Sequence, residues 1–407
     1  MSIGIIGAGI SGLQLALRLQ QLGIPATVHS AQDADGLKSG SPRNFPARFG
    51  ATQDREKALG VFDWPDEARV LAWSVAVSAP EGPPLEFEAT LTPPSSVVDF
   101  RLYLPHLFEA FTSRGGEVVV GAPDLDAVAR RHDLVVVANG DRSMRELFPR
   151  VPELSPFDGP QRIITTAIYH GIVEKSPNQL DLRLIPGVGE IFQIPFLSPK
   201  GRANVLAFEA VPGGPLESVS HLDADADPAK FYREVLALLE QFMPELRERV
   251  DTAEFATIGS REVLQGGVTP TVRKGWATLP NGRCALAIGD AWITNDPLTA
   301  QGANLGSYSA FALADLIGAQ TGPFDESFCR KASDSLWEHA KPVVEWSTAF
   351  LAPPPPHVVG LFQAAARDRR VADAFVSDFN DPVAMWQTLS SPAGVDGFLA
   401  GFPGGTR

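Results

Sequence analysis

The chain has 407 residues, of which 44% are apolar and 20% are charged, so it can bury a large core and does not have a disordered composition. Its formal net charge of -14 argues against a nucleic-acid partner, because phosphate binding requires clustered lysine and arginine. The chain opens directly into an apolar segment, and no apolar run approaches the roughly 18 residues that a membrane span needs. Neither Cys284 nor Cys329 lies in a CxxC pair, so we expect two reduced thiols and no metal. These features predict a cytoplasmic protein with no membrane segment.

The first 30 residues predict a βαβ unit. A buried strand is expected over residues 3–7, a helix over about 11–22 and a second strand over 26–30. Residues 31–55 are rich in glycine, serine, proline, asparagine and arginine, which predicts a long loop. A loop of this length in a compact protein is often functional.

Strands and helices alternate through the rest of the chain. We expect strands with a proline-rich turn over 73–100, a helix over 99–114 and two strands over 117–122 and 133–140. Residues 160–215 have a strand-like pattern, and a helix is expected over about 228–250. A strand pair to residue 290 and a helix over about 303–317 follow. Residues 325–407 are expected to be mostly helical, with a break at the prolines of 353–356.

The first motif is Gly7-x-Gly9-x-x-Gly12, placed between the first strand and the first helix. Gly7 allows a tight turn, Gly9 lets a pyrophosphate approach the backbone, and Gly12 lets the helix pack against the strand. The helix start, including Ser11, offers free N–H groups and a positive dipole to phosphate. The motif predicts a dinucleotide site, and tight packing alone is the alternative.

An acidic residue that usually accompanies this motif is missing. The second strand of such a unit ends in Asp or Glu, which holds the ribose hydroxyls. Here the strand ends in Val28-His29-Ser30. His29 or Ser30 could supply a weaker hydrogen bond, and a solvated loop position for His29 is the alternative. The departure predicts looser binding of the dinucleotide.

A second motif lies far from the first in sequence. Ile288-Gly289-Asp290 is followed by Asp296-Pro297 and by Gly302-Ala303-Asn304. A strand that ends in Gly-Asp can present its carboxylate to ribityl hydroxyls, and Pro297 can line the reacting face of a flavin. The N–H groups of a helix beginning at Gly302 would face the flavin's pyrimidine edge, which is negative when reduced. The alternative is a strand-turn-helix in which an aspartate caps the helix.

Together the two motifs resemble the FAD-binding signature of the para-hydroxybenzoate hydroxylase fold. The resemblance implies a third contact, from Arg101 to the pyrophosphate, although a surface ion pair is the alternative. We therefore expect an α/β fold in which a Rossmann-like FAD-binding domain is interleaved with a β-sheet substrate domain, plus a helical C-terminal region. The FAD-binding domain would comprise 1–72, 99–155 and 263–324, the substrate domain 73–98 and 156–262, and the helical region 325–407.

Within this fold the chain resembles the styrene and indole monooxygenases, from Ile3 to about Phe402. The segments that carry the resemblance are VDFRLYLP (98–105), LQGGVTP (264–270), GWATLPNG (275–282), DPLTAQGAN (296–304), DFNDPVAMW (378–386) and SSPAG (390–394). The second and fifth of these segments are not general flavin motifs, so they are fairly specific to this group.

The resemblance implies a two-component FAD-dependent monooxygenase. A separate NADH-dependent reductase would deliver reduced FAD, and the oxygenase would form a peroxyflavin with O2. The oxygen would pass to an aryl alkene or an indole-type double bond and give an epoxide. Two departures agree with a flavin that comes and goes. These are the missing ribose carboxylate and Asn139, which stands where single-component hydroxylases carry a second Asp.

The pocket residues are less clearly marked. Asn44 aligns with a pocket asparagine of the styrene enzymes, with a turn asparagine as the alternative. Gln265, beside Gly266-Gly267, could approach the flavin or belong to a plain bend. With Pro297 they are the candidate catalytic residues, although no side-chain acid, base or nucleophile is required, since the flavin performs the oxidation.

The pocket region also departs from the resemblance. The loop SPRNFPARFG (41–50) is atypical, and VLAWSVAVS (70–78) lacks the Tyr and His of the styrene enzymes. Arg43 or Arg48 would suit a polar substrate or a phosphate of FAD. The oxygenase type is therefore better indicated than the small aromatic substrate.

Three other functions remain open. They are a single-component NAD(P)H-dependent hydroxylase, a flavin halogenase and a non-catalytic nucleotide-fold binding protein. A Trp-x-Trp-x-Ile-Pro segment, typical of halogenases, is absent from the sequence. The sequence leaves open whether the protein forms a homodimer.

Overall fold

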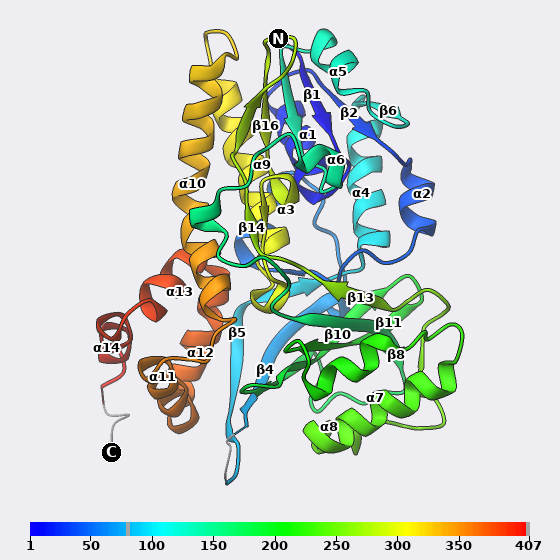
Figure 1. Ribbon diagram of the computed structural model, residues 1–407, viewed down its shortest axis with the longest axis vertical. Coiled ribbons are helices and arrows are strands. Elements are labelled where there is room, and N and C mark those ends of the chain that lie inside the picture. Colours follow the sequence, from blue (N-terminus) through cyan, green and yellow to red (C-terminus); the bar gives the residue numbers. More distant parts are fainter. Residues whose placement is uncertain (79–81, 404–407) are drawn as a thin grey trace.

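The computed structural model describes residues 1–78 and 82–403, and two β-sheets lie one beyond the other along its long axis (Figure 1). The first sheet has the strand order β15-β16-β7-β1-β2-β6. All neighbouring strands in it are parallel except β15 and β16. Its members are β1 (Ile3–Ile6), β2 (Ala26–Ser30), β6 (Glu117–Val120), β7 (Leu134–Val137), β15 (Trp276–Thr278) and β16 (Cys284–Ala287).

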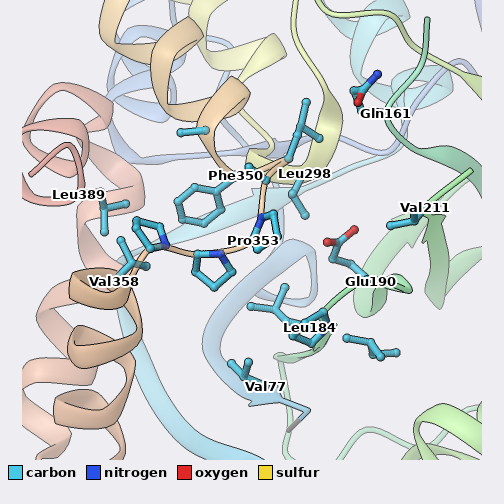
Figure 2. A pocket seen from close by; sticks show the side chains of 18 of the residues that line it. Val77, Gln161, Leu184, Glu190, Val211, Leu298, Phe350, Pro353, Val358 and Leu389 are labelled. Atoms are coloured by element: carbon cyan, nitrogen blue, oxygen red, sulfur yellow. The ribbon is translucent and has the colours of Figure 1, made fainter. Parts of the chain in front are cut away.

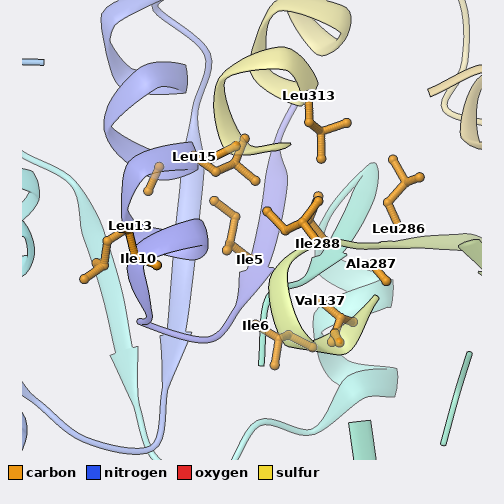
Figure 3. Close-up of a cluster of buried hydrophobic side chains, with 14 of the residues drawn as sticks. Ile5, Ile6, Ile10, Leu13, Leu15, Val137, Leu286, Ala287, Ile288 and Leu313 are labelled. Carbon is orange, nitrogen blue, oxygen red and sulfur yellow. The ribbon is translucent and has the colours of Figure 1, made fainter. Parts of the chain in front are cut away.

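Helices bury this six-stranded sheet, which explains why its central strands are continuous apolar runs. Helix α1 (Ile10–Gln21) connects β1 to β2 and packs against α4 (Phe100–Ser113) and α9 (Gly302–Ala319). Figure 3 shows side chains from β1, α1, β7, β16 and α9 meeting in one core. Short helices α5 (Leu125–Arg131) and α6 (Arg142–Arg145) lie on either side of β7 in the chain.

The second sheet is larger and mostly antiparallel. Its order is β12-β8-β11-β10-β9-β4-β5-β3, and β13 also pairs with β8. The strands are β3 (Ala47–Arg48), β4 (Arg69–Val77), β5 (Leu85–Val97), β8 (Ile163–His170), β9 (Gln179–Ile185), β10 (Gly189–Ser198), β11 (Gly201–Ala210), β12 (Ala256–Thr257) and β13 (Leu264–Gly267). A separate pair joins β14 (Thr271–Val272) to β17 (Ile293–Thr294).

Each face of the larger sheet has its own core, because side chains alternate along a strand. On β10, Phe192 and Phe196 pack toward the C-terminal helices, whereas Ile191 packs toward α7 (Pro228–Phe242) and α8 (Pro244–Arg247). We call the first face the inner face and the second the outer face.

The C-terminal region links the two halves. Helix α10 (Glu326–Ala349) runs alongside the six-stranded sheet and ends near the larger one (Figure 1). The helices that cover the inner face are α11 (Pro356–Arg367), α12 (Arg369–Ser377), α13 (Pro382–Leu389) and α14 (Pro392–Ala400). Across residues 1–78 and 82–403, no helix has the length and apolar character to cross a bilayer.

The predicted fold class is confirmed, since segments of a Rossmann-like unit alternate with strands of a second sheet before a helical end. Two strands fall outside the segments expected for them. β3 and β13 pair with the larger sheet, although their residues were expected in the FAD-binding domain.

The prediction of a loop over 31–55 was wrong in part. This stretch contains α2 (Ala34–Ser39), β3 and α3 (Gly50–Ala58). Asp33 caps α2, because its side chain accepts a hydrogen bond from the backbone N–H of Gly36. The many glycines and prolines of this stretch favour loops, so its composition did not indicate these short helices and this short strand.

Two predictions around prolines were also wrong. A proline-rich turn was expected within 73–100, but Pro93 and Pro94 lie inside β5, in an irregular stretch where the pairing with β4 shifts. Asp373 and Ser377 of α12 accept hydrogen bonds from the N–H groups of Thr90 and Thr92 there. The single helix expected over 228–250 ends at Phe242, and Pro244 starts the separate helix α8.

Candidate active site

The three motif glycines lie between the end of β1 and the first turn of α1, and each has different surroundings. A Cβ on Gly12 would lie 2.0 Å from the carbonyl oxygen of Gly7, so no side chain fits there. Gly7 has a φ of +119°, and a Cβ would meet Ala138. A Cβ on Gly9 would meet nothing within 4 Å. Only Gly9 therefore faces open space, which is where a pyrophosphate would approach the start of α1.

The second motif lies directly beside the first. Asp290 belongs to the short 3-10 turn η4 (Gly289–Ala291), which follows β16. A Cβ on Gly289 would lie 2.6 Å from Ser11 Oγ, and a Cβ on Gly140 would lie 3.0 Å from Asp290 Cβ. The ends of β1, β7 and β16 thus meet at one place. The Ser11 side chain is buried in this packing, so its expected cofactor contact is restricted to its backbone N–H.

Asp290 is exposed to water, yet protein surrounds most of its carboxyl group. The resulting loss of solvation raises the pKa of Asp290, against the opposing charge of Arg145. A recessed carboxylate of this kind is a strong hydrogen-bond acceptor. Together with the open sides of Gly9 and Gly302, it fits the ribityl chain and phosphates of FAD.

The end of β2 differs from what we expected. His29 is buried with its Nε2 3.5 Å from His132 Nε2, and burial lowers the pKa of both rings. The Ser30 hydroxyl donates to the backbone oxygen of Gln32. Neither side chain is therefore free to hold a ribose. Instead, the Gln32 side chain lies at the end of this strand and accepts a hydrogen bond from Arg43. A Gln two residues beyond the strand is too weak a sequence signal to have been found.

The loop that precedes α9 has a rigid geometry. Asp296 caps the turn η5 (Pro297–Thr299) by accepting from the N–H of Leu298, and Pro297 is exposed. Gly302 is exposed at the start of α9. The first N–H groups of a helix have no partners within that helix, so those of Gly302, Ala303 and Asn304 are available to a ligand.

The side chain of Asn304 makes hydrogen bonds within the protein. Its Oδ1 accepts from the N–H of Phe49 and from Thr52 Oγ1, and its Nδ2 donates to the oxygens of Ala47 and Ala300. All four interactions are between 2.8 and 2.9 Å. Asn304 therefore fixes residues 47–52 against α9, and only its backbone can meet a flavin.

Arg101 lies at the start of α4 but is paired with two carboxylates. Its guanidinium donates four hydrogen bonds to Asp99 and Glu262, at 2.7 to 3.0 Å. This cluster joins α4 to the segment that precedes β13. The structure thus favours the ion-pair alternative over the pyrophosphate contact, although here the pair is buried.

The candidates Gln265 and Asn44 lie on β13 and in the segment between α2 and β3. The Gln265 amide donates to the oxygens of Val219 and Leu222, so it is fixed at the end of η3 (Pro215–His221). Asn44 is exposed between α2 and β3. Its neighbour Phe45 packs edge-on against Phe196 of the inner face, with ring centroids 5.5 Å apart.

A large cavity lies between the inner face and the C-terminal helices (Figure 2). Its volume is about 460 Å³, and most of its wall is apolar. We call residues 295–301, which precede α9, the flavin loop. Leu298 of this loop, next to Pro297, forms part of the wall, so the cavity begins at the flavin loop. The other side chains labelled in Figure 2 come from strands of the larger sheet, from α11 and α13 and from connecting segments, and include Val77, Leu184, Val211, Phe350, Val358 and Leu389. A cavity of this size and character suits a small aromatic molecule.

Buried charged groups lie at and behind the polar end of this cavity, where Arg162 and Glu190 form part of its wall. Arg162 pairs with Glu190 at 2.7 Å, whereas one oxygen each of Glu209 and Asp296 has no hydrogen-bond partner among the described residues. Burial and the neighbouring acids raise the pKa of Glu209, and burial raises that of Asp296 to about 6. We therefore expect protons to be shared in this cluster, directly beside the flavin loop.

An aromatic cluster explains one departure from the family pattern. Trp73, in the segment that lacks the Tyr and His of the styrene enzymes, packs on Phe379 with centroids 4.6 Å apart. Phe379 also contacts Phe49 and Trp346. These rings fill the space between the inner face, residues 47–52 and the tail.

A buried ion pair holds the atypical 41–50 loop. Arg48 Nε lies 2.7 Å from Glu56 Oε1, and both side chains are 0% exposed. Tyr103 of α4 donates to Glu56 and accepts from Gln14 of α1. The network connects the loop to the helix of the glycine motif. Arg48 is thus committed to the protein and is not available to a substrate or a phosphate.

The fold is shared with flavin-dependent enzymes of known structure. The chain matches the flavin-dependent brominase Bmp2 with a TM-score of 0.68 and 14% identity, over 99% of each chain. It matches p-nitrophenol 4-monooxygenase PnpA from Pseudomonas putida DLL-E4 with a TM-score of 0.62 and 14% identity, over 94% of this chain and 98% of the other. With the glycine turn, Asp290 and the Pro297 loop in place, the fold and site define an FAD-dependent monooxygenase.

Sequence comparison narrows this class. The chain is 35% identical to the styrene monooxygenase StyA of Pseudomonas sp over 398 residues, which cover 96% of this chain and 95% of the relative. The StyA of Pseudomonas fluorescens is 34% identical over the same shares. A family model described as "Styrene monooxygenase A putative substrate binding domain" matches residues 140–249. The chain therefore belongs to the styrene monooxygenase StyA family.

Proposed function

We propose that this monooxygenase epoxidises an aryl alkene of the styrene type, using reduced FAD that a separate NADH-dependent reductase delivers. The balanced reaction is alkene, O2 and reduced FAD giving epoxide, water and oxidised FAD. The reduced flavin supplies the electrons that activate O2. The observation that carries the proposal is the apolar cavity whose wall includes Leu298, next to Pro297 of the flavin loop.

The protein's own groups would bind, orient and exclude water. The open side of Gly9 and the start of α1 would receive the pyrophosphate, with Gln32 and Arg43 near the ribose. Asp290 would accept hydrogen bonds from the ribityl chain. The free N–H groups at the start of α9 would stabilise the negative edge of the reduced flavin. The inner face and C-terminal helices would hold the alkene in a dry site and limit wasteful formation of hydrogen peroxide.

The proposal that FAD arrives from a partner rests on how weakly the ribose end is held. The side chains of His29 and Ser30, which end β2, make contacts within the protein, and neither of them is a carboxylate. Asn139 accepts from the N–H of Asp141 and donates to its carboxylate, so this turn is closed by its own residues. Both features suit an FAD molecule that binds reversibly and passes between the reductase and this protein.

The location of the substrate can be tested by filling the cavity. Val211→Trp should reduce styrene oxide formed per reduced FAD by about tenfold or more, because the indole occupies the space of a small aromatic ring. Val173→Trp, at a position that is 62% exposed, is the matched control. Styrene oxide and hydrogen peroxide would be measured after mixing FAD-loaded, reduced protein with oxygenated buffer.

In Val211→Trp the missing epoxide should be replaced by hydrogen peroxide, while FAD affinity is unchanged. Normal epoxide yield from a folded Val211→Trp variant would remove this cavity from the proposal.

A further inference from the structure

A second cavity of about 240 Å³ lies between α3, α9, α10 and residues 379–382. We call it the Arg55 cavity. It shares no lining residue with the cavity of Figure 2, and Gln301 and Asn304 form part of its wall. Thr52, Val343 and Phe379 provide a mixed polar and apolar lining.

Arg55 gives this cavity a positive charge that has no ion-pair partner among the described residues. Its one hydrogen bond is long, 3.4 Å to Ser307 Oγ, and its guanidinium lies 5.5 Å from the Tyr308 ring centroid. Within residues 1–78 and 82–403, no carboxylate oxygen comes within 4.0 Å of it, and loss of solvation lowers its pKa. By contrast, the buried Arg48, Arg101 and Arg162 all have carboxylate partners. Arg55 is partly buried and has no ion-pair partner among the described residues, so a ligand that brought a carboxylate would supply a charge-assisted hydrogen bond.

The neighbouring groups do not supply that carboxylate. His339 stacks on Tyr308 with centroids 3.7 Å apart, and burial followed by the charge of Arg55 lowers its pKa to about 4, so it is neutral at pH 7. Asp381 also lines the cavity, but its carboxylate makes no ion pair with Arg55 and instead caps α13, accepting from the N–H groups of Val383 and Ala384. Asp54 lies nearby but pairs with Lys57. Arg55 is thus the cation that a ligand would meet.

We propose that the Arg55 cavity binds a small organic carboxylate, with the carboxylate on Arg55 and the apolar body against Phe379 and Val343. Its lining is separate from that of the alkene cavity, and it adjoins the expected flavin site at Gln301 and Asn304. Its occupancy would stabilise residues 47–52, because two of its wall residues hold that segment. Asn304 accepts from Phe49 and Thr52, and Asn380 accepts from the N–H of Gly50 at 2.6 Å.

Calorimetric titration of the full chain with benzoate tests this proposal. We expect one benzoate per chain, and benzamide, which lacks the charge, should bind about tenfold or more weakly. Arg55→Gln should weaken benzoate binding by a similar factor, and Ala51→Trp should block it, since the exposed Ala51 lines the cavity. Arg130→Gln, which removes an exposed arginine on α5, is the matched control and should bind normally.

The same titration identifies the site. Excess FAD and the Val211→Trp substitution should leave benzoate affinity unchanged. Absence of benzoate binding would overturn the proposal, as would equal binding in folded Arg55→Gln and Ala51→Trp variants. Loss of binding in Val211→Trp would assign benzoate to the alkene cavity instead. The titration needs neither reduced flavin nor O2, so its failure would leave the epoxidation proposal intact.

Discussion

The nucleotide-binding half and the substrate half of this molecule differ in how strictly their functions restrict the residue type at each position. In the nucleotide-binding half, the turn after β1 places Gly7 and Gly12 where no side chain fits, so backbone geometry dictates the residue type. In the substrate half, the cavity is lined by apolar side chains from segments as distant as Val77 and Leu389, and many apolar residues could serve. A cofactor site built on backbone contacts is therefore marked in the sequence, whereas a cavity built on side-chain packing is not.

The strongest test of this difference is Gly12→Val. The added Cβ would lie 2.0 Å from the carbonyl oxygen of Gly7, so β1 and α1 would have to separate. We expect a loss of more than about 4 kcal/mol of stability, and failure to accumulate folded protein. Circular dichroism and thermal unfolding would measure this. A variant that unfolds at the wild-type temperature would show that the close packing at Gly12 is not required.

A buried charge should matter almost as much. Glu56→Ala leaves Arg48 unpaired in the interior and should destabilise the protein by about 3–5 kcal/mol. The control is Glu146→Ala, which removes an exposed pair with Arg142 and should change stability by less than about 1 kcal/mol. Denaturant unfolding of both variants gives the comparison. Equal, small effects would mean that the Arg48 network does not hold the 41–50 loop.

Gly9→Val separates binding from folding. Because a Cβ on Gly9 meets nothing within 4 Å, we expect an unchanged unfolding temperature and FAD affinity lowered by about 100-fold, since the side chain occupies the expected pyrophosphate position. Anaerobic titration with reduced FAD would measure the affinity. Tight FAD binding in this variant would contradict the assignment of the glycine turn.

Asp290→Asn should have a smaller effect on the same affinity. The amide keeps the size of the side chain but loses the charged acceptor, so FAD binding should weaken by about tenfold. Wild-type affinity should also fall as pH drops through the raised pKa of Asp290. An Asn variant with wild-type affinity and the same pH dependence would exclude Asp290 from contact with the ribityl chain.

The smallest effect concerns Asp296 of the flavin loop, which belongs to the buried carboxyl cluster. Burial raises the pKa of Asp296 from 3.8 to about 6, so the folded state binds this proton more tightly than the unfolded state. Stability should therefore fall as pH rises from about 4 through about 6. Asp296→Asn keeps the cap on η5 and should reduce that fall by about 1 kcal/mol between pH 5 and pH 7. An unchanged slope in unfolding experiments would show that Asp296 is ionised throughout.

Much of the nucleotide-binding half could be predicted from the sequence. The strand–glycine–helix order placed Gly7, Gly9 and Gly12, and the Gly-Asp pattern brought Asp290 to the same edge, because parallel strands end together. Long-range polar pairing could not be predicted. Nothing local indicates that Arg101 binds Glu262, 161 residues away, in addition to its neighbour Asp99.

The substrate half was predicted only as strands and helices. The hydrogen bonds of Gln265 to η3 depend on which face of the sheet its strand presents, and this is fixed by the pairing of β13 with β8. The cavity itself exists because the C-terminal helices leave space above the inner face, which no periodicity reports. The family-specific tail is explained only in three dimensions, where Asn380 holds Gly50 and Pro93.

Supply of electrons to the purified protein tests the central claim most directly. Styrene oxide would be measured in three parallel reactions, containing NADH with FAD, NADH with FAD and a separate flavin reductase, and chemically reduced FAD without nicotinamide. We predict no epoxide in the first reaction and epoxide in the other two. Oxidation of NADH with epoxide formation in the first reaction would contradict the account and identify a single-component enzyme.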